Sequence, residues 1–224
     1  MRRLNIAIDG PAGAGKSTIS KSIAKRLRLI YVDTGALYRA LGLYALRSGV
    51  RPGDEAAVLP LLETAAVELK YQEGEQRVFL NSEDISALIR TPEASMAASD
   101  ISAIPAVRAF LLDLQRDIAK KNDVIMDGRD IGTVVLPDAQ IKIFLTATPE
   151  DRAGRRYREL LAKGEPVSYD QVLADVIQRD HNDSNRAIAP LRQAEDAVLA
   201  DTTGFDLEEA IELLLKIIEE RRPK

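Results

Sequence analysis

The chain carries Gly10-Pro11-Ala12-Gly13-Ala14-Gly15-Lys16-Ser17-Thr18 directly after the apolar run of residues 4–8. This stretch fits the pattern Gly-x-x-x-x-Gly-Lys-Ser, and a segment with helical apolar spacing follows it at once. A phosphate-binding P-loop requires this order of strand, glycine-rich loop and helix. We therefore predict that residues 10–18 bind the phosphates of ATP or GTP, because the glycines let backbone N–H groups approach and the helix N-terminus adds its dipole.

Two polar side chains of this loop have distinct expected roles. Lys16 is expected to reach the β- and γ-phosphates, and the Ser17 hydroxyl is expected to bind Mg²⁺. Asp127 ends another apolar run, and a carboxylate in that position suits the Mg²⁺ shell through a water molecule. The sequence thus predicts Mg²⁺ as the cofactor that accompanies the nucleotide.

Composition excludes several other kinds of chemistry. The 224 residues suffice for one α/β domain with insertions or for two small domains, and 46% hydrophobic residues allow a sizeable core. Cysteine is absent, which excludes disulfides, thiolate zinc sites and cysteine nucleophiles. The only histidine, His181, is expected at the surface, so a histidine-based metal site or a Ser-His-Asp triad is disfavoured.

Charge and hydropathy indicate where the protein works. The net charge of −4 argues against a nucleic-acid partner. No apolar run approaches the roughly 18 residues of a membrane span, and no signal-peptide core follows the N-terminus. We expect a soluble cytoplasmic protein without a membrane partner, and a monomer by default.

Strand and helix signals alternate along the chain, which predicts an α/β fold with a parallel sheet flanked by helices on both faces. Strands are expected at residues 4–8, 29–32, 123–127, 141–145 and 197–200. Helices are expected at residues 17–27, 36–47, 105–121, 149–163 and 169–183. Asp206 and Glu209 form a capping box that opens a last helix. Its inner face is expected to carry Leu207, Ile211, Leu214, Leu215 and Ile218.

An inserted element of a different kind is predicted between residues 52 and 89. Residues 67–71 and part of 77–81 alternate between apolar and polar, and residues 72–76, which contain Gly74, join them. This pattern predicts an antiparallel hairpin with one polar face.

Polar clusters follow two of the predicted buried strands, where ligands of parallel sheets bind. After the strand at 29–32, Thr34 is suited to bond a sugar or base, and Arg39 to clamp a phosphate. The alternative is that Thr34 only caps a helix and Arg39 lies at the surface. After the strand at 123–127, Arg129 is suited to bind a phosphate, and the alternative is a glycine turn flanked by solvated charges.

Two further clusters lie in the predicted helices 149–163 and 169–183. Arg152, Arg155 and Arg156 share one helix face, where like charges are costly unless an anion or carboxylate partners lie nearby. Gly154 and Gly164 would let this segment move as a lid. Arg179-Asp180 and Asp183-Ser184-Asn185-Arg186 are suited to recognise a sugar or base, although a capped helix end explains them equally.

Taken together, three segments resemble the bacterial cytidylate kinase family. They are Asp33-Thr34-Gly35 with Tyr38-Arg39, Asp127-Gly128-Arg129-Asp130-Ile131-Gly132-Thr133, and Asn185-Arg186-Ala187-Ile188-Ala189-Pro190-Leu191. The resemblance spans essentially the whole chain and implies a single kinase domain, 1–224, of the P-loop NTPase type. Its core would comprise about 1–35, 103–149 and 185–224. A nucleoside-monophosphate (NMP)-binding subdomain would comprise about 36–102 with a β-hairpin insert at 66–81, and a short helical lid about 150–184.

The resemblance also implies an activity, the transfer of the ATP γ-phosphate to CMP or dCMP. Thr34 and Asp183 would hold the ribose, and Arg39 and Arg129 the CMP phosphate. Cytosine would be recognised by Ser99, Arg108 and Arg186. Asp130 would orient the arginines, and Arg179 would lie near the acceptor.

The residues expected to act in transfer itself are all charged. They are Lys16, Arg129, Asp130, Arg152, Arg155 and Arg156. Such a set suits phosphoryl transfer, which depends on positioning and charge neutralisation. Two alternatives stay open on sequence alone: a P-loop kinase for another small acceptor, and a non-enzymatic nucleotide switch.

Overall fold

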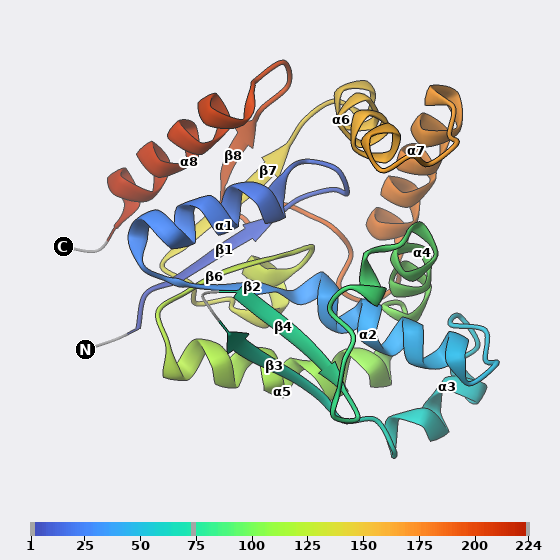
Figure 1. Cartoon of the computed structure of the whole chain (residues 1–224). Coiled ribbons are helices and arrows are strands. Elements are labelled where there is room, and N and C mark those ends of the chain that lie inside the picture. Colours follow the sequence, from blue (N-terminus) through green and yellow to red (C-terminus); the bar gives the residue numbers. More distant parts are fainter. Residues whose placement is uncertain (1–2, 73–74, 223–224) are drawn as a thin grey trace. The chain divides into compact units, whose positions relative to one another are not determined.

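The computed structural model describes residues 3–72 and 75–222. The chain divides into two compact units. Figure 1 shows their helices and strands, coloured along the sequence. The first unit contains the chain up to Tyr31 and from Lys121 onward, so it is built from both ends of the sequence. The second unit is Val32–Lys120.

A five-stranded parallel sheet forms the centre of the first unit, with strand order β2-β6-β1-β7-β8. The strands are β1 (Asn5–Asp9), β2 (Ile30–Asp33), β6 (Val124–Gly128), β7 (Ile141–Thr146) and β8 (Val198–Asp201). The last two residues of β2, Val32 and Asp33, are counted in the second unit. The central strand β1 is fully buried at Ile6, Ala7 and Ile8, as expected for a parallel strand with neighbours on both sides. The register pairs Asp9 with Gly128, which aligns the carboxyl ends of β1 and β6.

Helices α1 (Lys16–Leu27) and α8 (Leu207–Arg221) pack against this sheet through an aliphatic core. The core includes Ile19, Ile23 and Leu214. Helices α6 (Pro149–Ala162) and α7 (Tyr169–Asn185) pack on each other around a smaller apolar cluster. A π-helical turn, η2 (Ile131–Val135), follows β6 closely.

The second unit combines helices with a small antiparallel sheet of order β3-β4-β5. The strands are β3 (Val67–Gln72), β4 (Glu75–Leu80) and β5 (Glu83–Asp84). The helical elements are α2 (Thr34–Arg47), α3 (Glu55–Leu62), η1 (Leu88–Arg90), α4 (Pro92–Ile101) and α5 (Pro105–Lys121). Leu37, Leu41, Val107 and Leu111 belong to the core that joins α2 and α5 within this unit.

The predicted α/β fold is confirmed, and the predicted strands and helices are present with ends shifted by one or two residues. The capping box of Asp206 and Glu209 is confirmed. Leu207 is a correction: it is 50% exposed at the start of α8 and does not belong to the inner face. The predicted turn at Gly74 lies outside the described residues.

Within residues 3–72 and 75–222, no single helix is both long and apolar enough to cross a membrane. Among these described residues, α4 and α5 together have the length and apolar composition of a span, but the chain bends by 103° between them.

Candidate active site

The P-loop follows β1 in the first unit and is shaped by its glycines. Gly10 has φ +152°, and a Cβ built on it would lie 1.9 Å from the Leu145 carbonyl oxygen, so only glycine fits there. Gly15, with φ +86°, occupies the N-cap position, and α1 begins at Lys16. The strand, loop and helix predicted for residues 4–27 are therefore in place.

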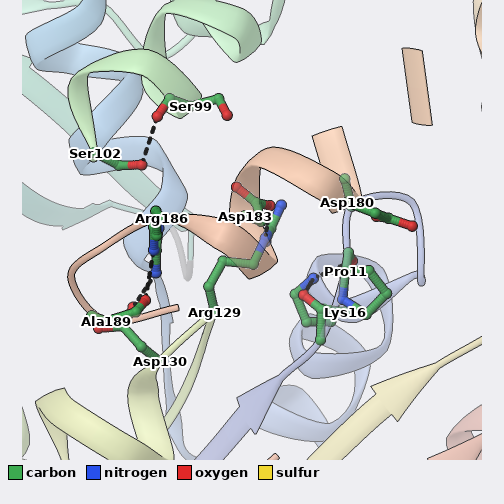
Figure 2. Close-up of polar contacts among 12 residues, drawn as sticks. Pro11, Lys16, Ser99, Ser102, Arg129, Asp130, Asp180, Asp183, Arg186 and Ala189 are labelled. Atoms are coloured by element: carbon green, nitrogen blue, oxygen red, sulfur yellow. Dashed lines mark hydrogen bonds and ion pairs between the residues drawn. The ribbon is translucent and has the colours of Figure 1, made fainter. Parts of the chain in front are cut away.

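Lys16 folds back over this loop. It is 6% exposed, and its ammonium donates hydrogen bonds to the carbonyl oxygens of Gly10 and Pro11, each at 2.7 Å. Figure 2 shows the side chain of Lys16 beside Pro11. Burial, followed by the nearby Arg129 guanidinium, lowers the pKa of Lys16 well below its ordinary value. An anion bound at the loop would favour the charged form again.

Ser17 and Asp127 form an oxygen pair beside Lys16. The Ser17 hydroxyl donates to Asp127 Oδ2 at 2.8 Å, and the Tyr31 hydroxyl donates to Asp127 Oδ1 at 3.1 Å. Oxygen donors of this kind fit Mg²⁺, which usually keeps several waters and takes one or two protein ligands. The described part of the chain contains no cluster of three or more His, Cys, Asp or Glu residues suited to a metal, so phosphate and water oxygens would have to complete the shell.

The loop after β6 makes two ion pairs (Figure 2). One is with the C-terminal end of α7, and the other is with the residue that follows α7 in the sequence. Arg129 Nε donates to Asp183 Oδ2 at 2.8 Å, and Arg186 Nη2 lies 3.3 Å from Asp130 Oδ1. Arg186 Nε also donates to the Ala189 carbonyl oxygen at 2.6 Å. These pairs bring together four of the residues predicted to bind CMP.

Arg129 and Asp183 each stabilise the charged form of the other. Burial opposes the charge of Asp183, but Arg129 and then Arg179 outweigh it and lower the pKa of this carboxyl. Burial likewise opposes the charge of Arg129, and Asp183 is the first of three aspartates that raise its pKa. Both groups are therefore held charged, which suits the binding of an anionic and hydroxyl-bearing ligand.

The three arginines of α6 differ in their surroundings. Arg152 is 2% exposed, and its guanidinium donates to Asp180 of α7, to the Ala12 carbonyl oxygen of the P-loop and to the Ala147 carbonyl oxygen. Arg155 pairs with Asp151 and donates to the Thr202 carbonyl oxygen. Arg156 pairs with Glu159. Each arginine thus has a carboxylate partner, and Arg152 links α6 to the P-loop.

In the second unit, Asp33 organises the start of α2. Its carboxylate accepts a hydrogen bond from the Ala36 amide at 3.0 Å and pairs with Arg39 at 2.7 Å. The predicted alternative that Thr34 caps this helix is wrong, because Asp33 is the cap and Thr34 is the first helical residue. Burial opposes the charge of Asp33, but Arg39 outweighs it and the pKa of Asp33 is lowered.

Ser99 and Arg108 lie in successive helices of the same unit. The Ser102 hydroxyl donates to the Ser99 carbonyl oxygen at 2.8 Å (Figure 2). Arg108 Nη1 donates to the Ser102 carbonyl oxygen at 3.4 Å. Arg108 is 8% exposed, with its guanidinium 5.5 Å from the centre of the Tyr38 ring. Ser102 thus connects the two predicted cytosine-binding residues.

The sequence did not predict the partners of three carboxylates: Asp9, which accepts the backbone amides of Ile131 and Gly132, Asp33, which pairs with Arg39, and Asp180, which pairs with Arg152. Asp9 and Asp33 each end a strand directly before a predicted binding loop, and this position is a usable signal. Asp180 carries no such signal, because its importance depends on Arg152, which lies 28 positions earlier.

Comparison with known proteins gives a consistent result. The model of the family described as Cytidylate kinase matches residues 6–220. A cytidylate kinase of Caldicellulosiruptor saccharolyticus is 52% identical over 217 residues, covering 97% of this chain and 96% of that protein. A cytidylate kinase of Carboxydothermus hydrogenoformans is 51% identical over 215 residues, covering 96% of this chain and 97% of that protein.

Two solved structures share the fold at low sequence identity. An uncharacterized protein from Eubacterium ventriosum has a TM-score of 0.54 and 14% identity, covering 98% of this chain and 99% of that chain. A gluconokinase from Sinorhizobium meliloti has a TM-score of 0.50 and 12% identity, covering 98% and 93%. At these identities the likeness concerns the fold alone.

Proposed function

The chain belongs to the cytidylate kinase family and is a nucleoside monophosphate kinase. We propose that it transfers the γ-phosphate of ATP to CMP or dCMP in the presence of Mg²⁺. The products would be ADP and CDP or dCDP. One observation supports this proposal most: two ion pairs, Arg129–Asp183 and Arg186–Asp130, lie in the same unit as the P-loop. A nucleotide switch without enzymatic activity is disfavoured by membership of a kinase family.

We propose the following roles in the first unit. Arg129 binds the CMP phosphate, Asp183 accepts hydrogen bonds from the ribose hydroxyls, and Arg186 recognises cytosine. Asp130 orients Arg186, and Arg179 lies near the acceptor. The buried pairing of these groups supports the roles, because a charged group that is already held in place loses little entropy when it binds a ligand.

In the second unit, Arg39 would bind the CMP phosphate and Thr34 the ribose, while Ser99 and Arg108 would recognise cytosine. The Asp33 carboxylate, which pairs with Arg39 and caps α2, would hold that arginine in place. These roles follow the family resemblance of the sequence, residue by residue.

Residues 10–18 would bind the ATP phosphates. Lys16 would stabilise the charge that develops on the transferred phosphoryl group, with Arg152, Arg155 and Arg156 contributing from the segment 150–184. Ser17, and Asp127 through water, would hold Mg²⁺, which neutralises phosphate charge when bound. No general base is needed, because the attacking CMP phosphate oxygen is already anionic near neutral pH. Closure of residues 150–184 would exclude water.

The base-recognition role of Arg186 has a direct test. Arg186→Ala should lower kcat/KM for CMP by about 10- to 100-fold, the equivalent of one hydrogen bond to a charged group, and leave the KM for ATP within about 2-fold. Steady-state kinetics with each substrate varied in turn measures both values. Arg192→Ala, at an exposed arginine of the following segment, is the matched control. Equal losses toward CMP and ATP would contradict the role.

A cytoplasmic monomer without nucleic-acid or membrane partners remains our prediction. The choice between CMP and dCMP would depend on Thr34 and Asp183, the two residues proposed for the sugar.

A further inference from the structure

Asp9 is a buried carboxylate with no role in the mechanism above. It is the last residue of β1 and is 3% exposed. Its two oxygens accept hydrogen bonds from the backbone amides of Ile131 and Gly132, each at 2.7 Å. The Asp9 side chain thus binds the first two residues of η2, which lie more than 120 positions away in the sequence.

Gly132 is matched to this contact. A Cβ on Gly132 would lie 3.3 Å from Asp9 Oδ2 and 3.1 Å from Cδ of Lys142. Both distances are tighter than ordinary contacts, so a larger residue at position 132 would push the amide away from the carboxylate. The lack of a side chain at Gly132 thus allows its backbone amide to approach the Asp9 carboxylate closely.

Burying this carboxylate is unfavourable in itself. Desolvation raises the pKa of Asp9 to about 6, the two amide hydrogen bonds oppose the rise, and Asp130 and Lys16 exert smaller effects of opposite sign. An asparagine would avoid the buried charge but offers one acceptor oxygen, and its NH₂ group would face an amide N–H. The carboxylate is the side chain that satisfies both amides.

The position of Asp9 connects two functional loops of the same unit. It directly precedes Gly10, the first residue of the P-loop, whose carbonyl oxygen accepts from Lys16. Asp9 binds the amides of the two residues that follow Asp130 in the sequence. Asp130 pairs with Arg186, and Arg129 is the residue before Asp130. Any shift of η2 would therefore move Arg129 and Asp130 relative to the P-loop.

We propose that Asp9 is a positioning residue for the acceptor: it fixes the Arg129–Asp130 loop relative to the P-loop so that the CMP phosphate meets the γ-phosphate of ATP. This inference rests on the proposed function. It predicts that loss of the carboxylate impairs the use of CMP far more than the binding of ATP, because the P-loop has its own lysine and glycine contacts.

Two variants test the contact from its two sides, Asp9→Asn and Gly132→Ala. Both should raise the KM for CMP by about 10-fold or more, since small misplacements of binding groups are costly, and leave the KM for ATP within about 2-fold. Asp123→Asn is the matched control, because Asp123 also accepts a backbone amide, that of Leu4 at 2.9 Å, but at the other end of the sheet. It should leave both KM values unchanged.

Amide hydrogen exchange and calorimetric CMP titration provide readouts that do not depend on turnover. Asp9→Asn should lose protection at Ile131 or Gly132 and bind CMP about 10-fold more weakly, with a melting temperature that confirms a folded protein. Wild-type protein that fails to bind CMP would overturn the proposed function and this inference with it. If the wild-type protein binds CMP and both variants bind it with the same affinity, this inference alone is overturned.

Discussion

Lys16 illustrates how a single residue is prepared for its ligand. Its ammonium is buried and satisfied by two carbonyl oxygens of the loop that it is expected to serve. Burial and then Arg129 lower the pKa of Lys16, so the protein groups around it stabilise its positive charge only weakly. Triphosphate binding would reverse this, since anionic oxygens near the ammonium favour the charged form.

Lys16→Ala should therefore reduce kcat by about 1,000-fold or more while the fold is retained, because the loss concerns charge stabilisation in the transition state. The measurement is turnover with Mg-ATP and CMP, accompanied by a circular-dichroism melt. Lys25→Ala, at an exposed lysine of the same helix, should leave kcat unchanged. Near-normal turnover of Lys16→Ala would remove this lysine from the mechanism.

At the scale of elements, helix α2 approaches α4 closely at Gly42. A Cβ at this position would lie 2.9 Å from Ala97 Cβ and 3.0 Å from the Ala97 carbonyl carbon. The two helices both begin with a side-chain cap, Asp33 for α2 and Thr91 for α4. Small residues thus let the backbones of α2 and α4 approach closely, beside the aliphatic core that joins α2 and α5.

Gly42→Ala should lower the free energy of unfolding by about 1 kcal/mol, because overpacking costs about 1–3 kcal/mol and the gain in helix propensity offsets about 1 kcal/mol of it. Gly154→Ala is the matched control within α6, where the added Cβ meets only the end of the Arg158 side chain at 3.8 Å. It should raise the free energy of unfolding by about 0.5–1 kcal/mol. Urea unfolding measures both, and equal stabilisation by the two variants would contradict close α2–α4 packing.

The elements also indicate what sequence can predict. Buried strands and amphipathic helices were predictable from their apolar spacing, and the capping box located the start of α8. Helices α3 and α4 were missed: α3 is nearly all apolar and contains Pro60, and α4 consists mostly of small residues. Helix α3 lacks a clear amphipathic period. The buried residues of α4 do follow helical spacing, but they are Ala94, Ala97, Ala98 and Ile101, and alanine gives only a weak apolar signal. Asp54 and Thr91 cap the two helices as N-cap rules expect.

The candidate site was only partly predictable for a related reason. The P-loop is a local motif, so its spacing alone predicts roles for Lys16 and Ser17. The turn η2 depends on Asp9, and the Arg186–Asp130 pair joins residues 56 positions apart. Such contacts form only once the sheet has aligned its carboxyl ends, so the spacing of residues along the sequence does not predict them. The resemblance to a known family was needed to expect that Asp130 orients the arginines.

At the scale of the whole molecule, the chain combines a parallel-sheet unit that carries the P-loop with an inserted unit that carries the antiparallel sheet. The proposed CMP-binding residues are divided between the two units. Residues 10–18, which we propose to bind the ATP phosphates, belong to the first unit.

The most direct test of the account is a coupled ADP-release assay with Mg-ATP and six acceptors in parallel: CMP, dCMP, UMP, AMP, GMP and shikimate. Since cytosine-specific contacts are assigned to Ser99, Arg108 and Arg186, the account predicts fast turnover with CMP and dCMP and little with the other four. Fast turnover with AMP, GMP or shikimate in place of CMP would contradict it.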